Sequence, residues 1–374
     1  LLRPGLYHAD GQILDEVYVY GSYLQSKMYA AGVGCLDCHD AHSAEPVADG
    51  NAVCTQCHSP AGNPDFPTLT LAEYDTPAHH FHAPSGEGAQ CMACHAPESV
   101  YMGNDWRADH SFRVPRPDIA ARTGAPDACT ACHTDRDPAW AAAELAERFP
   151  GSEARGPHYA LTLAEGRDDA VAAAGDLAAL AEDPGQPGIV RATTLWLIET
   201  VDDPVTAAQV APLLADGDPL VRAAAVGVQR MADPQDRVLR LLPVLADPVR
   251  SVRMAAARAL LDAPILRLPN DAQADLDAAM AEWRAALASR LDFPETHLQL
   301  AGMALTMRAI PQAEAAFREV VRLDPQRTVA WVMLVRIAAA TEGAAEAYDV
   351  VQEALVAVPG DPALSALEGE LRDR

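Results

Sequence analysis

Four copies of the pattern Cys-x-x-Cys-His lie between residues 35 and 133 and together use all eight cysteines of the chain. They are Cys35-Leu-Asp-Cys38-His39, Cys54-Thr-Gln-Cys57-His58, Cys91-Met-Ala-Cys94-His95 and Cys129-Thr-Ala-Cys132-His133. This pattern is typical of c-type haem attachment, in which each cysteine sulfur forms a thioether to a haem vinyl group and the histidine binds the iron. The spacing therefore predicts four haem c groups, with His39, His58, His95 and His133 as the proximal iron ligands.

Cysteine pairs at this spacing also occur in disulfides, zinc sites and redox dithiols, and the histidine separates these alternatives. With 12 histidines in 374 residues, random placement would put a histidine after a given pair about 3% of the time. Four such placements would arise on the order of once in a million chains. Four zinc sites that each use three adjacent ligands would also be unusual. Covalent haem is therefore the preferred interpretation.

Composition restricts the partners and the compartment. The formal net charge of −25 disfavours nucleic acid and anionic lipid, and it leaves a basic partner, bound cations or a like-charged assembly with buried contacts as alternatives. The sequence contains no run of eighteen apolar residues, so no transmembrane segment is predicted. The chain opens at Leu1 without a signal peptide. Because this kind of haem attachment takes place outside the cytoplasm, we expect a processed or truncated start, a removed export signal and a periplasmic or extracellular location.

Residues 1–137 predict a coil-rich tetrahaem cytochrome c domain. Proline and glycine recur through this part, and long apolar runs are few. Such a segment would ordinarily be disordered, but four porphyrin plates tied to the chain can replace a side-chain core. We expect a short helix at each motif, and a loosely amphipathic helix over residues 12–29 with a break near Gly21.

Residues 138–268 predict HEAT-like helical repeats. Asp137-Pro138 predicts the start of a helix over residues 139–149. Further along, Val190-Arg191, Val221-Arg222 and Val252-Arg253 recur at two equal intervals, each opening a segment rich in alanine and leucine. A helix pair that repeats at such a constant interval is typical of an α-solenoid.

Residues 269–374 predict a linking helix followed by tetratricopeptide-like (TPR-like) repeats. The linking helix is expected over residues 271–291. Beyond it, Ala313, Phe317 and Pro325 recur at one constant interval as Ala347, Val351 and Pro359. That interval matches the period of tetratricopeptide repeats. The predicted fold class is therefore mainly α, with a haem domain followed by a solenoid of HEAT-like and TPR helix pairs.

The sixth position of each iron separates an electron carrier from a catalyst, because a second histidine or a methionine closes the iron and an empty position permits chemistry. Eight histidines remain, and His297 is assigned to packing or the surface of the repeats. The seven candidates for the four distal positions are His8, His42, His79, His80, His82, His110 and His158. Met28, Met92 and Met102 are alternative sixth ligands. Which histidine serves which haem stays open.

Three runs carry a resemblance to a known family: Gly-Leu-Tyr-His8-Ala-Asp-Gly-Gln-Ile-Leu-Asp-Glu-Val-Tyr-Val-Tyr-Gly-Ser, Cys-x-x-Cys-His-Asp-Ala-His42-Ser and Asp-His110-Ser-Phe-Arg-Val-Pro-Arg-Pro. Together they resemble a bacterial multihaem c-type cytochrome family with C-terminal HEAT-like and tetratricopeptide repeats, over essentially the whole chain. The resemblance implies an exported protein whose bis-histidine haems serve respiratory electron transfer. Members of that family carry further haem motifs upstream, so the resemblance also leaves open the processing of a longer cytochrome.

The leading hypothesis is an electron-transfer protein that carries electrons through four closely spaced haems, with the helical repeats binding a partner or another copy of the chain. An extracellular cytochrome filament and a soluble shuttle both fit this hypothesis. The alternative is a haem enzyme that acts on a nitrogen oxide or a sulfur oxyanion at one open iron. No catalytic residue is predicted, because the repeats contain no convincing nucleophile–base pair and no phosphate-binding loop.

Overall fold

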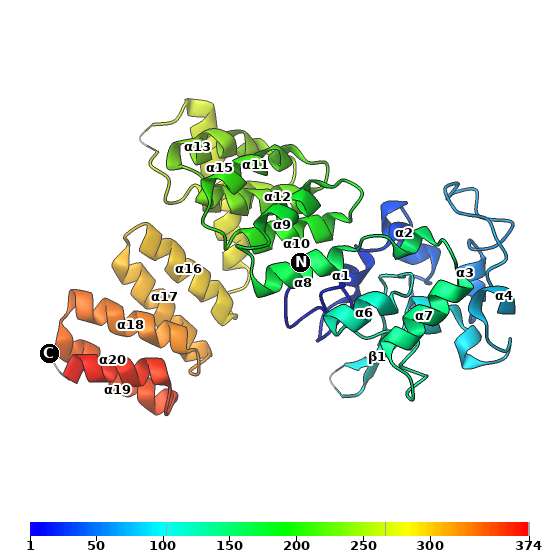
Figure 1. Cartoon of the computed structure of the whole chain (residues 1–374). Coiled ribbons are helices and arrows are strands. Elements are labelled where there is room, and N and C mark those ends of the chain that lie inside the picture. Colours follow the sequence, from blue (N-terminus) through cyan, green and yellow to red (C-terminus); the bar gives the residue numbers. More distant parts are fainter. Residues whose placement is uncertain (102, 266, 373–374) are drawn as a thin grey trace. The chain divides into compact units, whose positions relative to one another are not determined.

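The computed structural model describes residues 1–101, 103–265 and 267–372, and it is mainly helical (Figure 1). The chain divides into two compact units, Leu1–Ala232 and Asp233–Arg374. This boundary falls inside the predicted HEAT-like segment, and the domain boundaries expected after residues 137 and 268 stay predictions. Met102, one of the alternative sixth ligands, lies outside the described residues. No helix within the described ranges is long and apolar enough to cross a membrane.

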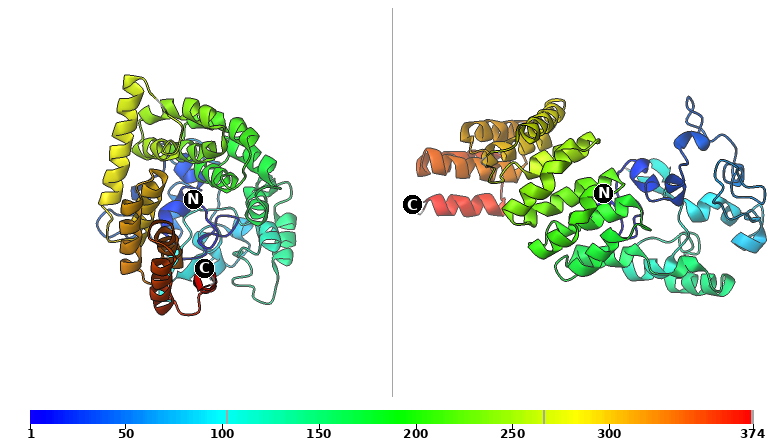
Figure 2. Two further views of the ribbon diagram at one scale, coloured as in Figure 1. Left: turned by 90° about the vertical axis from the view of Figure 1, so that its left-hand side faces the viewer. Right: turned by 90° about the horizontal axis from the view of Figure 1, so that it is seen from above.

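The first part of unit 1 consists of short elements joined by long coil, drawn from blue to cyan in Figures 1 and 2. The elements are α1 (Val19–Tyr23), α2 (Lys27–Ala30), η1 (Cys35–Asp37), α3 (Ala52–Thr55), α4 (Pro77–His80), η2 (Glu87–Ala89), α5 (Cys91–His95), β1 (Glu98–Tyr101), β2 (Asp105–Ala108) and α6 (Pro117–Thr123). The two strands pair antiparallel, with Glu98 opposite Ala108. No residue from Lys27 to Gly88 is buried, so this stretch has no side-chain core of its own.

The helix predicted over residues 12–29 is wrong in its first half, and the break expected near Gly21 is also wrong, because Gly21 lies within α1. Helices occupy only Val19–Tyr23 and Lys27–Ala30, whereas Ile13 forms an extended bridge with Tyr7 and is buried. Ile13 also belongs to the buried cluster that contains Leu163 and Leu177, so packing overrides the local helical spacing. Short helices occur at the first three motifs as expected, and the fourth motif is a turn.

The second part of unit 1 is a series of longer helices with a conventional apolar core. They are α7 (Pro138–Arg148), η3 (Glu153–Arg155), α8 (Tyr159–Asp168), α9 (Ala174–Glu182), α10 (Gly188–Ile198), α11 (Pro204–Gln209), η4 (Ala211–Ala215), α12 (Pro219–Val228) and η5 (Gln229–Met231). Helix α7 confirms the predicted start, because the Asp137 side chain accepts a hydrogen bond from the Trp140 amide. Leu163, Leu177 and Leu195 are fully buried in the core of these helices.

The N-terminal segment ties the coil-rich part to these helices. Leu2 is fully buried in the helical core, and its amide donates to the Thr193 hydroxyl of α10. Arg167 of α8 donates to the carbonyl groups of Leu2, Tyr7 and His8. The start of the chain therefore lies against the longer helices of unit 1, where the letter N marks it in Figure 1.

Equivalent elements of the middle of the chain begin at equal intervals, at Gly188, Pro219 and Arg250, and the same interval separates the starts at Ala211 and Leu242. Equivalent side chains also bond alike: Arg222 donates to the Asp216 carbonyl over 2.8 Å, and Arg253 donates to the Asp247 carbonyl over 2.7 Å. In unit 1, Arg191 forms a buried ion pair with Asp216 at 2.5 Å. Burial alone would raise the pKa of the Asp216 carboxyl, but hydrogen bonds from Arg191 and from the Asp218 amide hold it below its usual range.

Replacing Asp216 with asparagine is expected to destabilise unit 1 by about 3 kcal/mol near neutral pH, because it leaves the buried Arg191 charge without its carboxylate. The lowered pKa means that the ion pair contributes above the unfolded carboxyl pKa of about 3.9, and that this contribution is lost as the pH falls through the folded-state pKa. Urea unfolding at about pH 7 and about pH 2.5 should show the difference from the parent shrinking at the lower pH. Asp236→Asn, which alters an exposed pair with Arg240, is the control and should cost less than about 0.5 kcal/mol.

Unit 2 is helical throughout its described core. Its elements are α13 (Pro234–Leu241), η6 (Leu242–Ala246), α14 (Arg250–Ala259), α15 (Asn270–Ala288), α16 (Pro294–Thr306), α17 (Ile310–Leu323), α18 (Thr328–Thr341), α19 (Ala344–Ala357) and α20 (Pro362–Arg372). Helix α15 agrees closely with the linking helix predicted over residues 271–291. The starts of α16, α18 and α20 are equally spaced, and the same interval separates the start of α17 from that of α19. Phe317, Trp331 and Leu334 are buried in their shared core.

Candidate functional site

Each Cys-x-x-Cys-His motif closes one turn of backbone. The histidine amide donates to the carbonyl of the first cysteine over 2.9 Å at His39, 2.9 Å at His58 and 2.8 Å at His133, and the third motif lies within α5. One such turn places both cysteines of a motif on the same side of the backbone. All eight thiols are free, and each is exposed or half-buried. Both sulfurs of every motif are therefore available for covalent attachment.

Consecutive motifs lie next to one another in unit 1. Burial raises the pKa of the Cys38 thiol, and the neighbouring Cys57 raises it further. The Cys91 thiol beside Cys54, in the third motif, raises the pKa of the Cys54 thiol, and burial raises it further. Burial and the nearby Cys132 likewise raise the pKa of Cys94. The four motifs thus form a continuous series in chain order.

Polar side chains hold this series in place. Asn51, which precedes α3, donates to the Asp75 carboxylate over 2.8 Å and to the Ala89 carbonyl over 2.9 Å. The side-chain oxygen of Asn51 accepts from the Cys91 amide over 2.8 Å. Gln56 donates to the Asp37 carbonyl over 3.1 Å, which joins the second motif to the first. Hydrogen bonds therefore connect the first three motifs.

Three of the four motif histidines face a second histidine ring. The ring centroids of His39 and His110 are 6.3 Å apart with the planes inclined by 24°. His95 and His79 are 6.2 Å apart at 12°. His133 and His82 are 6.2 Å apart at 37°. Three of the seven distal candidates are thus brought opposite motif histidines.

This spacing fits a shared iron. Two imidazole rings that bind one metal, each through a nitrogen about 2 Å from it, have centroids about 6 Å apart. The Nδ1 atoms of His39, His110 and His95 donate to the carbonyl oxygens of Ala44, Ala108 and Arg113 over 2.8, 2.9 and 2.9 Å. Such bonds fix the ring orientation and leave Nε2 free to bind a metal. The Nδ1 atom of His82 has a similar bond to the His80 carbonyl.

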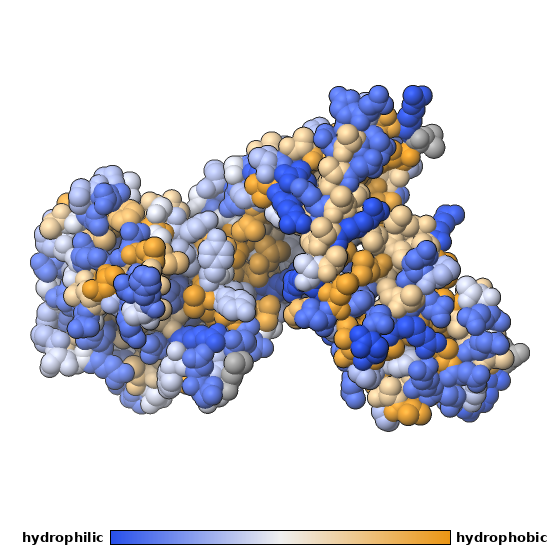
Figure 3. Space-filling model, turned by 180° about the vertical axis from the view of Figure 1, so that it is seen from behind, coloured by the Kyte–Doolittle hydropathy of each residue, from blue (hydrophilic) through white to orange (hydrophobic). Residues whose placement is uncertain are grey.

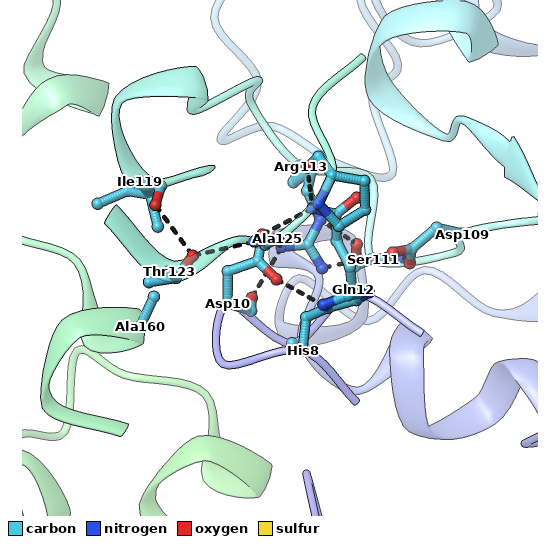
Figure 4. Close-up of polar contacts among 12 residues, drawn as sticks. His8, Asp10, Gln12, Asp109, Ser111, Arg113, Ile119, Thr123, Ala125 and Ala160 are labelled. Atoms are coloured by element: carbon cyan, nitrogen blue, oxygen red, sulfur yellow. Dashed lines mark hydrogen bonds and ion pairs between the residues drawn. The ribbon is translucent and has the colours of Figure 1, made fainter. Parts of the chain in front are cut away.

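A buried polar network supports the third motif (Figure 4). The Arg113 carbonyl accepts a hydrogen bond from His95. The side chain of Arg113 is in turn held by hydrogen bonds and nearby carboxylates. Its guanidinium donates to the Asp10 carbonyl and to the Ser111 hydroxyl, both over 2.8 Å. It also lies 3.7 Å from the Asp10 carboxylate and 3.5 Å from that of Asp109. The N-terminal segment therefore fixes the backbone that orients His95.

The same network orients His110. Asp109, the residue before it, is buried, and its carboxylate accepts from the Ser22 hydroxyl and from the Ser111 amide. The strand pair β1–β2 ends directly before this point, at Ala108. Ser22, Ser111 and the end of β2 at Ala108 thus hold the turn that contains His110. The order Asp-x-Ser at residues 109–111 is a turn signal in the sequence, but nothing local indicates the long-range bond to Ser22.

His58 has different neighbours. Its ring contacts Tyr74 edge-on, with centroids 6.2 Å apart and planes at 78°. Tyr74 also meets His79 edge-on at 5.2 Å, and its hydroxyl donates to the Thr70 carbonyl. Burial lowers the pKa of His58, and the charge of His95 lowers it further. Among the described residues, no second histidine faces His58 as His110 faces His39.

Among the described residues, no ring of the remaining distal candidates is paired with a motif histidine. His42 is exposed, and its amide donates to the Asp40 carboxylate. His80 accepts from the His82 amide through Nδ1. His158 caps α8 by accepting from the Ala160 amide, and burial together with Arg116 lowers its pKa to about 4. Burial, together with Arg167 and Arg113, also lowers the pKa of His8, although Asp10 opposes this shift.

His297 lies in unit 2, where its Nε2 bonds the Leu291 carbonyl over 2.8 Å, in keeping with a packing role. Met28 and Met92 form no part of the three ring pairs. Within the described ranges, no three His, Cys, Asp or Glu side chains converge as ligands for a bare metal ion.

No protein-family model, curated protein or solved structure matches the chain.

Proposed function

We propose that this chain is a multihaem c-type cytochrome that carries electrons through four closely spaced haem c groups. The observation that carries the proposal is the set of three histidine pairs, His39–His110, His95–His79 and His133–His82, at 6.2–6.3 Å. Each pair joins a motif histidine to a distant residue, as bis-histidine ligation of a haem iron requires. The absence of a side-chain core between Lys27 and Gly88 also favours cofactors that fill this space.

The motif cysteines would hold the four haems covalently, and the paired histidines would bind three of the irons from both sides. Bound haem supplies reversible one-electron chemistry at its iron. The chain's own part is to keep the motifs adjacent through the bonds of Asn51 and Gln56. It also holds His39, His95 and His110 in a fixed tautomer through backbone carbonyl groups. Fixed ligands favour electron transfer, because little rearrangement is needed when the charge changes.

The helical repeats would serve recognition. Two series of equally spaced helix starts, one in the middle of the chain and one towards its C-terminus, support an α-solenoid of HEAT-like and TPR-like pairs. Such a surface suits a redox protein or a further copy of the chain, and the net charge of −25 disfavours nucleic acid. Hydrophilic residues cover much of the face drawn in Figure 3. Haem attachment to these motifs would place the protein in the periplasm or outside the cell.

Haem content tests the proposal directly. Pyridine haemochrome analysis of protein matured with c-type attachment should give four haems per chain, one for each motif. A Cys129→Ser/Cys132→Ser variant should give three, and both proteins should be reversibly reduced and reoxidised in a spectroelectrochemical titration. Purified protein that contains zinc or disulfides in place of haem would overturn the proposal.

A further inference from the structure

The second motif differs from the other three in what its histidine faces. His39, His95 and His133 each face another histidine at 6.2–6.3 Å, whereas the ring beside His58 is Tyr74. Tyr74 stands edge-on at 78°, and its hydroxyl is bonded to the Thr70 carbonyl. This arrangement does not offer a second nitrogen to a metal bound by His58.

The other histidines are placed by contacts of their own. His8 and His158 belong to the region around Asp10, Arg113 and Arg167, near the N-terminal segment. The His80 ring lies beside that of His82, with centroids 6.4 Å apart, and its Nδ1 atom accepts from the His82 amide. Among the described ring contacts, the partner of His58 is Tyr74 and not His80. His42 is exposed on a turn held by Asp40, and no described aromatic ring packs against it.

We infer that a haem attached at the second motif would have one ligand from the chain, His58, and would be able to bind a small neutral diatomic molecule such as CO or NO. This inference rests on the proposed function, because it requires a haem at each motif. Charge selects the class of ligand: a net charge of −25 repels anions such as nitrite and sulfite. The aromatic ring of Tyr74 and the half-buried position of His58 also favour an uncharged ligand.

CO binding and electron paramagnetic resonance test the inference on the holoprotein. The oxidised protein should show one high-spin and three low-spin haems, and the reduced protein should bind one CO per chain. A Cys54→Ser/Cys57→Ser variant should contain three haems, all low-spin, and should lose CO binding. Three haems with CO still bound would place the open iron elsewhere and overturn the inference.

The matched control is His42→Ala, which should leave both the spin state and the CO stoichiometry unchanged. Four low-spin haems and no CO binding in the parent protein would also overturn the inference. If His42→Ala then produced a high-spin haem, His42 would be the missing ligand. The haem count separates these results from failure of the proposed function, because that function requires four haems whatever their spin state.

Discussion

Apoprotein made without haem attachment is expected to be cut by protease within residues 27–88 at least about a hundredfold faster than the holoprotein. No residue from Lys27 to Gly88 is buried, so side-chain packing cannot offset a backbone ordering cost of about 1–2 kcal/mol per residue. Cofactors covalently held at Cys35, Cys38, Cys54 and Cys57 would remove that freedom. Limited proteolysis followed by mass spectrometry of the fragments gives the cleavage sites and rates.

The helices of the same unit provide the internal control. Helices α8, α9 and α10 carry the fully buried Leu163, Leu177 and Leu195, so they should keep their protection and their circular dichroism without haem. A Leu195→Ala change should lower the free energy of unfolding of these helices by about 3 kcal/mol. Faster cleavage of the helices in this variant would show that the assay reports side-chain packing. Equal resistance of residues 27–88 in apoprotein and holoprotein would mean that the segment orders itself, and the proposed role of the cofactors as its core would fail.

Replacing His110 with alanine is expected to convert one low-spin haem to high-spin without changing the haem count. His110 faces His39 at 6.3 Å with its Nδ1 atom bonded to the Ala108 carbonyl, so under the proposed function the substitution would remove one of the two histidines that hold the first haem. Loss of a histidine ligand should also raise the reduction potential of that haem by on the order of 0.1 V. Electron paramagnetic resonance and a spectroelectrochemical titration measure the two effects.

Two further variants make this result specific. His42 is close in sequence to the first motif, but among the described residues it faces no other ring. The His42→Ala variant should therefore keep the parent spectrum. Ser22→Ala removes a hydrogen bond to Asp109 and should broaden the His110-dependent low-spin signal without abolishing it. Added imidazole should restore the low-spin signal of His110→Ala. An unchanged spectrum for His110→Ala would remove His110 from the coordination sphere.

Local sequence predicted much of the helical part of the chain. Asp137 before Pro138 is enough to begin α7, since the carboxylate and the proline act within one turn. The repeated Val221-Arg222 pair also predicted a helix that opens there, and α12 begins at Pro219, because each repeat must bury the same apolar face. The helix expected from residue 12 failed because Ile13 is drawn into a buried bridge with Tyr7, a contact that local periodicity does not contain.

The sequence by itself determined the proximal half of each candidate haem site, because two cysteines and a histidine within one short motif are arranged by a single backbone turn. Only the tertiary structure decided the distal half. It brings His110, His79 and His82 opposite His39, His95 and His133, and it leaves His58 beside Tyr74. The physical reason is that a distal ligand reaches its partner through long-range contacts, such as those of Asp109 with Ser22 and of Arg113 with Asp10. Such contacts depend on where the whole backbone goes, and no local pattern encodes them.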